Sequence, residues 1–120
     1  MNLSIELRHI DGVAILDLAG RVSVLERNLR EVACQLLERG ERNLIINLAN
    51  VSYLDNSGLG QLCWLHTVIR NRGGRMLLLK PTSRIRKLLN ITRLDTVLQS
   101  FDNEAEAIAA IPRVKSVISA

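Results

Sequence analysis

The sequence predicts an α/β domain with a mixed, mostly parallel sheet of four to five strands and about four covering helices. From Val13 onward, short apolar runs alternate with longer segments of helical periodicity, the order of a parallel sheet covered by helices. The opening residues end in Asp11-Gly12, a strong hairpin turn, so the first strand should pair antiparallel with the second. Hydrophobic residues make up 48% of the chain and aromatic residues 2%, so the core must be aliphatic.

The strands follow from short apolar patterns. Leu3, Ile5 and Leu7 alternate with polar residues, which predicts a first strand with one solvent-facing side. Residues 13–19 are apolar apart from Asp17, so they should form a strand inside the sheet. Three further short apolar segments are expected to be strands, at residues 44–48, 76–79 and 97–101. Residues 49–56 are expected to form a loop.

Four helices are expected between these strands. The first should run from about residue 25 to 39 and the second from about residue 57 to 72, each followed by glycine. Thr82 or Ser83 can cap a third helix, and Asp102 or Asn103 a fourth, which Pro112 ends. The length of 120 residues suits one domain, so we expect residues 1–112 to form it and residues 113–120 to be a tail or helix extension.

The composition indicates in which compartment the protein acts and which classes of partner it does not bind. No apolar run reaches the roughly 18 residues of a membrane span, and no signal peptide opens the chain. Cys34 and Cys63 do not form a CxxC pair and fit a reducing compartment, so we expect a cytoplasmic protein without a disulfide. Only three aromatic residues are present, and no nucleic-acid-binding motif occurs, so direct nucleic-acid binding is not expected.

The charge is uneven. The formal net charge is +4, yet residues 70–93 hold eight basic residues and no acidic ones. A solvated basic surface explains this segment, and so does a surface for an acidic partner or for a phosphate on a ligand. Both interpretations stay open at this point.

A polar turn between a strand and a helix is the main functional candidate. In α/β sheets, functional groups gather where a strand ends and a helix begins, and Asp55-Asn56-Ser57-Gly58 lies at such a place. Each of the first three residues is also a favoured helix cap, so their types alone indicate only a cap. Gly58 and Gly60 should leave the backbone open to close approach.

Helical spacing adds two residues to this surface. At about 100° per residue, Gln61 and Trp64 point within about 40° of Ser57. An exposed Trp64 would suit a partner surface, because tryptophan is a common interface anchor. The alternative is that another helix covers Trp64.

Three catalytic or metal sites find little support. A receiver domain would use Asp55 and Lys80-Pro81, but the second acidic pair that holds magnesium is missing. Cys63 and His66 are too few for a zinc site, so no metal is expected. A serine hydrolase would need Gly-x-Ser-x-Gly, and Asp55 stands where the first glycine belongs. We therefore expect no enzyme, no catalytic residue and no cofactor.

Residues 44–60, LIINLANVSYLDNSGLG, resemble the signature of the STAS domain, and in particular the bacterial anti-sigma factor antagonists. The resemblance implies that Ser57 accepts phosphate from a partner that is both anti-sigma factor and GHKL-type serine kinase. It implies that the unphosphorylated protein binds this partner, which releases a sigma factor. The chain differs from the family pattern at Asn56, Asn47 and Ser23.

The resemblance and the helical spacing together give a candidate partner surface. Its residues are Asp55, Asn56, Ser57, Gly58, Gln61, Trp64 and Ser23. Two other roles stay open within the family: a scaffold component of a stress-signalling assembly, and a small-ligand or nucleotide-binding module. A homodimer is open as well.

Overall fold

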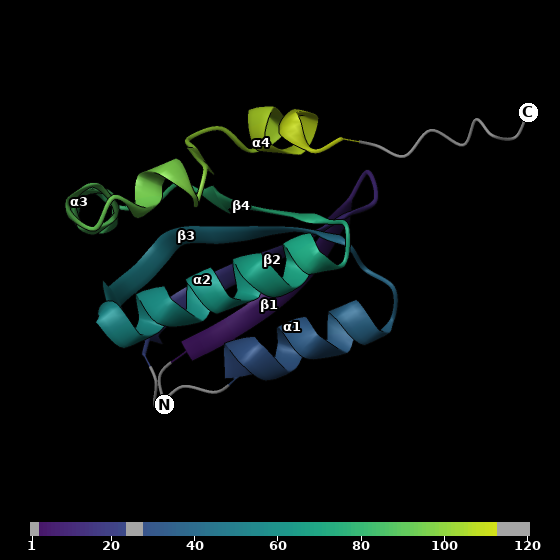
Figure 1. Ribbon diagram of the computed structural model, residues 1–120, viewed down its shortest axis with the longest axis horizontal. Coiled ribbons are helices and arrows are strands. Elements are labelled where there is room, and N and C mark those ends of the chain that lie inside the picture. The colour runs from purple at the N-terminus through teal and green to yellow at the C-terminus, as the bar shows by residue number, and fades with distance from the viewer. Residues whose placement is uncertain (1–2, 24–27, 113–120) are drawn as a thin grey trace, which may run out of the picture.

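The computed structural model describes residues 3–23 and 28–112, which form one five-stranded sheet with helices on both faces (Figure 1). The strands lie in the order β1-β2-β3-β4-β5. β1 is antiparallel to β2, and every other neighbouring pair is parallel. The predicted fold class is confirmed. The strands are β1 (Leu3–Ile10), β2 (Val13–Val22), β3 (Asn43–Leu54), β4 (Arg75–Leu79) and β5 (Ser100–Phe101).

The helices alternate with the parallel strands as predicted. They are α1 (Asn28–Glu38), α2 (Asn56–Asn71), α3 (Ser83–Ile91) and α4 (Glu104–Ala110), with a 3₁₀ turn η1 (Leu94–Thr96) after α3. Thr82 caps α3 and Asn103 caps α4, each accepting a backbone amide on its side-chain oxygen. In the described part of the chain, no helix has the length and apolar character that a membrane crossing requires.

The antiparallel start of the sheet depends on a two-residue turn. Asp11 and Gly12 have φ angles of 54° and 79°, both in the left-handed region. Turns of this kind match the twist of the strands that they join. The turn pairs Ile10 with Val13 and sets the register of the whole hairpin.

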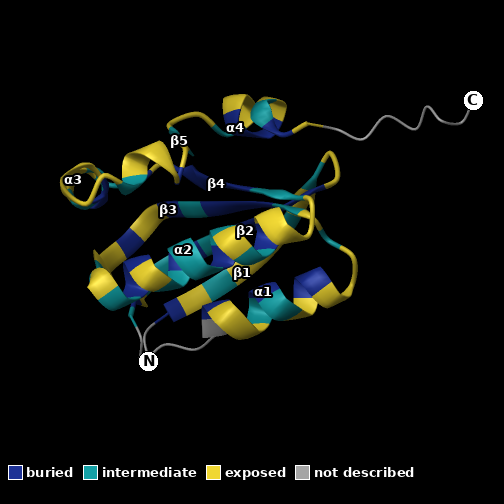
Figure 2. Ribbon diagram, viewed as in Figure 1, coloured by how far each residue is buried: buried dark blue, intermediate teal, exposed yellow. Residues whose placement is uncertain are grey.

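Two cores lie on opposite faces of the sheet. The larger core lies under α1 and α2 and includes Leu16, Ile46 and Leu62, all fully buried (Figure 2). The smaller core packs α4 against the other face, with Ile15, Ile45 and Ile108 among its members. Alternate residues of β2 and β3 point to opposite faces, which explains why residues 13–16 and 44–46 are apolar at every position. The start of β3 is therefore covered on both faces, whereas its end contacts only the larger core, through Val51 and the partly buried Leu54.

A polar network closes the edge of the smaller core. Arg8 on β1 binds the carboxylates of Asp17 on β2 and Glu104 on α4, at 2.6 and 2.7 Å. Asn47 donates its side-chain amide to Asp17 at 2.8 Å. The hydrogen bond from Arg8 holds the pKa of each carboxyl below its ordinary value, with a smaller contribution from Asn47 at Asp17. The network ties α4 to the first three strands.

The expected loop at residues 49–56 is wrong for most of its length. β3 continues through these residues to Leu54 and pairs with an equally extended β2, placing Val51 beside Gly20 and Leu54 beside Val22. Irregularities in the β2 register let the two strands follow each other past Asp17. Polar side chains in this stretch point to solvent, and the Ser52 hydroxyl donates to the Gly20 carbonyl at 3.2 Å.

Other boundaries shift less. The last strand covers only Ser100–Phe101, because the chain is still turning after η1: the amides of Val97 and Leu98 both donate to the Leu94 carbonyl, at 3.0 and 2.7 Å. The predicted start of the first helix at residue 25 lies outside the described residues. So does the tail at residues 113–120.

Glycine contacts seat α2 and the turn that follows it. A Cβ on Gly74 would overlap the backbone carbonyl of Arg42, so only glycine lets the chain pass there on its way into β4. The Arg42 side chain donates to the carbonyl of Arg72, just past the last residue of α2. The turn after α2 is therefore fixed to the start of β3.

Candidate functional site

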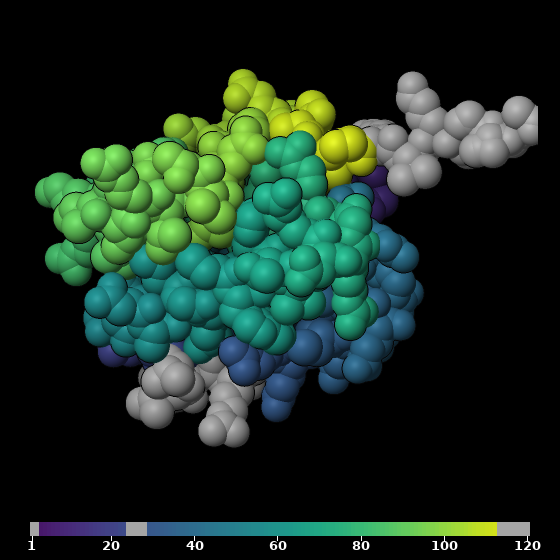
Figure 3. All heavy atoms as spheres, viewed as in Figure 1, coloured from purple at the N-terminus to yellow at the C-terminus, as the bar shows by residue number. Residues whose placement is uncertain are grey.

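The candidate site lies where β3 ends and α2 begins, on the surface that α2 and α3 share in Figure 3 (teal and green). Asp55 is the helix cap, with an extended backbone. Its Oδ1 accepts the Gly58 amide at 2.8 Å and the Ser57 hydroxyl at 2.6 Å. Of the three favoured cap residues, Asp55 therefore serves as the cap, and Asn56 and Ser57 lie in the first turn.

Two hydrogen bonds set the charge of Asp55. The bond from the Ser57 hydroxyl is the main cause that lowers the pKa of this carboxyl, and the Gly58 amide adds to it. Asp55 is therefore a carboxylate at neutral pH. Ser57 is half-buried, in the first turn of a 16-residue helix whose positive end favours anions.

Gly58 lets this turn approach the end of β2. It is buried, and a Cβ there would overlap the carbonyl oxygen of Val22 and lie 2.9 Å from the Cδ1 of Leu54. Gly60 is different, because a Cβ at that position meets nothing within 4 Å. The close approach expected of both glycines therefore applies only to Gly58.

Gln61 and Ser23 are brought together from separate elements. The Gln61 side-chain amide donates to the backbone carbonyl of Ser23, just beyond β2. Its Oε1 is buried and takes no hydrogen bond from the residues that the structure describes. Gln61 thus links the first half of α2 to the end of β2, beside Ser57.

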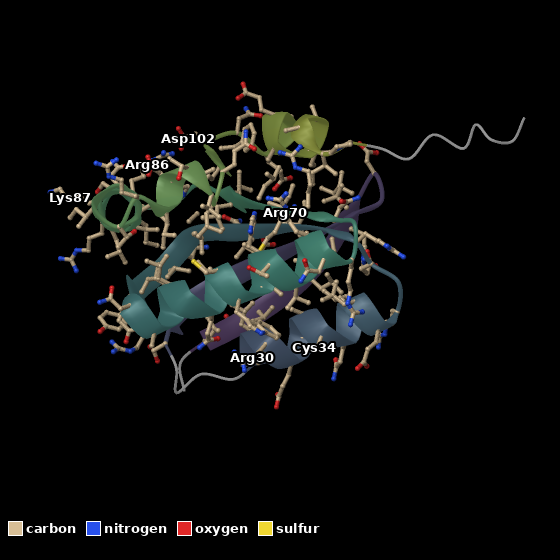
Figure 4. All side chains as sticks on the ribbon, in the orientation of Figure 1. Arg30, Cys34, Arg70, Arg86, Lys87 and Asp102 are labelled. Carbon is tan, nitrogen blue, oxygen red and sulfur yellow. The ribbon has the colours of Figure 1, made fainter. Side chains whose placement is uncertain are left out.

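Trp64 is covered by a neighbouring helix, which was the alternative to an exposed ring. The guanidinium of Arg30 on α1 lies 4.2 Å from the centre of the Trp64 ring, and Figure 4 shows Arg30 on the α1 side of α2. The ring is half-buried and packs against the larger core. Trp64 lies about 10 Å along the helix from Ser57, from the rise of 1.5 Å per residue.

The comparison with protein families decides the assignment. Residues 4–107 match the family model of the STAS domain. The chain belongs to the STAS domain family.

Several proteins that are similar to this STAS domain in sequence or in structure are named anti-sigma factor antagonists. The anti-sigma F factor antagonist of Paenibacillus polymyxa is 30% identical over 115 residues, covering 92% of this chain and 97% of the relative. An anti-sigma factor antagonist from Mycobacterium paratuberculosis superimposes with a TM-score of 0.81 at 18% identity, over 91% of this chain and 93% of its own. The phosphorylated form of SpoIIAA from Bacillus superimposes with a TM-score of 0.69 at 22% identity, over 88% of this chain and 97% of its own.

The sequence pattern did not reveal one feature of the STAS domain next to this turn. The Arg21 guanidinium lies 4.1 Å from the centre of the Tyr53 ring, across the paired ends of β2 and β3. Tyr53 also lines a cavity of about 240 Å³ between the end of β3 and α3, together with Leu54, Ile85 and Leu88. Extending the strand pattern to Leu54 would have placed Tyr53 there.

Other singled-out residues lie elsewhere. Asn47 binds Asp17 and the Ala49 amide, so it belongs to the polar network of the sheet. Burial raises the pKa of the Cys63 thiol. The described residues include no group of three or more His, Cys, Asp or Glu side chains that could hold a metal.

Proposed function

We propose that this STAS domain is an anti-sigma factor antagonist that phosphorylation of Ser57 switches off. The observation that carries the proposal is the Ser57 hydroxyl in the first turn of α2, hydrogen-bonded to the Asp55 carboxylate at 2.6 Å. The unphosphorylated domain would bind an anti-sigma factor of the GHKL serine kinase type and thereby release a sigma factor. The domain itself performs no catalysis in this proposal and acts in the cytoplasm.

The names of the relatives support the regulatory role. The Paenibacillus polymyxa protein, which aligns with 92% of this chain, is an anti-sigma F factor antagonist. SpoIIAA is an anti-sigma factor antagonist whose structure is known in phosphorylated and unphosphorylated forms. A protein with this fold and these relatives fits a partner-binding role better than an enzymatic one.

The geometry favours phosphoryl transfer to Ser57. In the transfer, the Ser57 Oγ attacks the γ-phosphorus of ATP, the bond to ADP breaks and the hydroxyl proton leaves. The hydrogen bond to Asp55 fixes the direction of the oxygen. Because the pKa of Asp55 is lowered, this carboxylate is a weak base, and we assign it orientation, with proton removal left to the kinase.

The phosphate would act at the surface. A phosphoserine adds about −1.5 to −2 charge at pH 7, and the start of a helix accommodates an anion. The fold should therefore survive phosphorylation. The new charge would lie beside the Asp55 carboxylate, so a partner that fits the neutral hydroxyl would meet two adjacent anionic groups.

The proposed partner surface keeps the residues that the sequence suggests. Asn56 is exposed in the first turn, and Gln61 holds the end of β2 near Ser57. Ser23 contributes through its backbone, and Gly58 lets the turn lie close to β2. Trp64 would contribute at the edge of this surface, through its half-buried ring and the covering Arg30.

Transfer of phosphate by the purified partner kinase tests the proposal. The domain is incubated with a GHKL anti-sigma kinase from the same genome and ATP, and the modified residue is mapped by mass spectrometry. Phosphate on Ser57, lost in Ser57→Ala and retained in Ser52→Ala, is the expected result. Ser52 is a matched control because it is exposed and lies five residues away. Phosphate on another residue, or none with any such kinase, would overturn the switch.

A further inference from the structure

We infer that a second site, at the opposite end of α2 from Ser57, binds a small organic phosphate. A cavity of about 500 Å³ lies between the last turns of α2 and the start of β4. Its lining includes His66 and Arg70 from α2, Arg75 from β4, and Val97 and Gln99 from the segment before β5. Pockets for small ligands measure about 300–1,000 Å³, so the space exceeds the needs of a bare ion.

The charge of this cavity is positive. Its lining contains two arginines and no acidic residue. Arg70 and His66 are one helical turn apart, and the charge of Arg70 contributes, after burial, to the lowered pKa of His66. Figure 4 shows Arg70 on the side of α2 that faces away from α1, beside β4.

The two arginines keep their charge available for a ligand. Two other arginines are neutralised by carboxylates, Arg8 by Asp17 and Arg86 by Asp102. Arg75 instead donates to two neutral oxygens, the Ala110 carbonyl at 3.2 Å and the Gln99 side chain at 2.9 Å. These bonds hold its guanidinium in place without cancelling its charge. Within the described residues, Arg70 has no carboxylate partner either.

The carbonyl groups at the end of α2 have hydrogen-bond donors other than the Arg70 side chain. Carbonyl groups at a helix C-terminus attract cations, which is the ordinary role of an arginine in a last turn. Here the carbonyls of Ile69 and Arg70 accept the amides of Gly74 and Gly73, each at 3.0 Å. The carbonyl of Arg72 accepts the Arg42 side chain. These carbonyls therefore have other donors, and the Arg70 side chain lines the cavity with its charge available to an anion.

The lining gives the class of ligand. Paired guanidinium groups recognise phosphate through several charged hydrogen bonds. Val97 is 46% exposed, and its isopropyl group faces the same cavity as the arginines. An apolar or planar body attached to the phosphate would cover Val97, which inorganic phosphate cannot do. A phosphomonoester with a small apolar body fits both halves of the site.

Amide NMR titration of the full chain tests this site with two probes, inorganic phosphate and phenyl phosphate. Saturable shifts are expected at Gly73, Gly74, Met76 and Leu77. Phenyl phosphate should bind several-fold more tightly, because it also buries apolar surface. Val97→Ala should weaken the binding of phenyl phosphate and leave the binding of inorganic phosphate unchanged.

A matched pair of charge variants separates a site from general attraction. Arg70→Gln should lower the affinity for both probes about tenfold, because it removes one charged hydrogen-bonding group. Lys87→Gln removes the same charge from α3, where Lys87 does not line the cavity and lies well away from Arg70 in Figure 4, and should leave the affinity for both probes unchanged. Equal losses in the two variants, shifts confined to other surfaces, or no saturation would each overturn the site. The site is independent of the Ser57 switch, so kinase phosphorylation of Arg70→Gln should proceed normally.

Discussion

The Ser57 hydroxyl and the Gly58 amide share one acceptor, Oδ1 of Asp55, at 2.6 and 2.8 Å. One carboxylate oxygen therefore both caps α2 and orients the proposed phosphoacceptor. Changes at Asp55 can separate these two roles, because asparagine keeps the cap but loses the charge.

Asp55→Asn should cost little stability, whereas Asp55→Ala should lower the unfolding free energy by about 1 kcal/mol through loss of the cap. Both variants should slow phosphorylation of Ser57, since neither presents a carboxylate to its hydroxyl. Urea unfolding and the initial rate of phosphate transfer measure the two effects. A normal transfer rate in both variants would show that Asp55 acts only as a cap.

Ser57→Asp should weaken binding of the anti-sigma partner by about tenfold or more, because an anion would face the partner beside Asp55. The melting temperature should change little, since an acidic side chain is favourable in the first turn of a helix. Ser52→Asp places the same charge on a nearby exposed strand residue and should bind almost normally. Calorimetric titration measures the affinity of both variants for the partner. Equal losses of affinity would show that the added negative charge acts through the overall charge of the domain and not through its position at Ser57.

Gly58→Ala should destabilise the domain by about 1–3 kcal/mol, because the added methyl group overlaps the Val22 carbonyl. Gly60→Ala, two residues on in the same helix, should stabilise it by about 0.5–1 kcal/mol, since open space surrounds that position. Chemical denaturation of both variants gives the comparison. Similar stability changes in the two would contradict the close contact between α2 and β2.

Stability should fall with acid through the Arg8 network. The pKa values of Asp17 and Glu104 lie below their ordinary 3.8 and 4.5, so both groups bind fewer protons in the folded than in the unfolded state. Their contribution is complete above those ordinary values and is lost as pH falls through the lowered pKa values. The stability difference between wild type and Arg8→Gln should therefore shrink between pH 7 and pH 3.

Arg86→Gln is the control for this series. It breaks a pair whose carboxylate, on Asp102, is 80% exposed, so its effect on stability should be smaller because solvent screens the pair. Urea unfolding at several pH values measures both variants. A pH-independent difference for Arg8→Gln would rule out the network as a source of acid sensitivity.

Arg30→Gln should shift the fluorescence of Trp64 to longer wavelength, because water replaces the guanidinium over the ring. The stability loss should be about 0.5–1 kcal/mol, the range of an exposed cation–π contact. Trp64→Ala should cost more, since the ring also packs against the core. Arg39→Gln, just past the end of α1, should leave the emission unchanged. An unaltered spectrum in Arg30→Gln would contradict the stacking.

Local chemistry accounts for the parts of the fold that could be predicted. Alternating apolar residues gave β1, the Asp11-Gly12 turn gave the hairpin, and Thr82 and Asn103 are caps by residue type. The turn at Asp55 was placed for the same reason. These features depend on neighbours within a few residues.

Long-range pairing explains what could not be predicted. The extension of β3 depends on β2, whose Arg21 lies more than 30 residues before Tyr53. The cover over Trp64 comes from Arg30, on a helix that the sequence alone does not orient toward α2. Likewise, the cavity at Arg70 and Arg75 is closed by Val97 and Gln99, which come from a later part of the chain. The basic segment alone therefore does not reveal that two of its arginines line one cavity.

The two close glycine contacts described for α2 and the turn after it restrict movement of this helix against the sheet. A Cβ on Gly58 would overlap the Val22 carbonyl, and a Cβ on Gly74, just past the helix, would overlap that of Arg42. The two ends of α2 are thus packed closely against the end of β2 and the start of β3. A shift of the helix toward either carbonyl would create a steric overlap, so we expect a phosphate on Ser57 to act on the partner that touches it and not by moving α2.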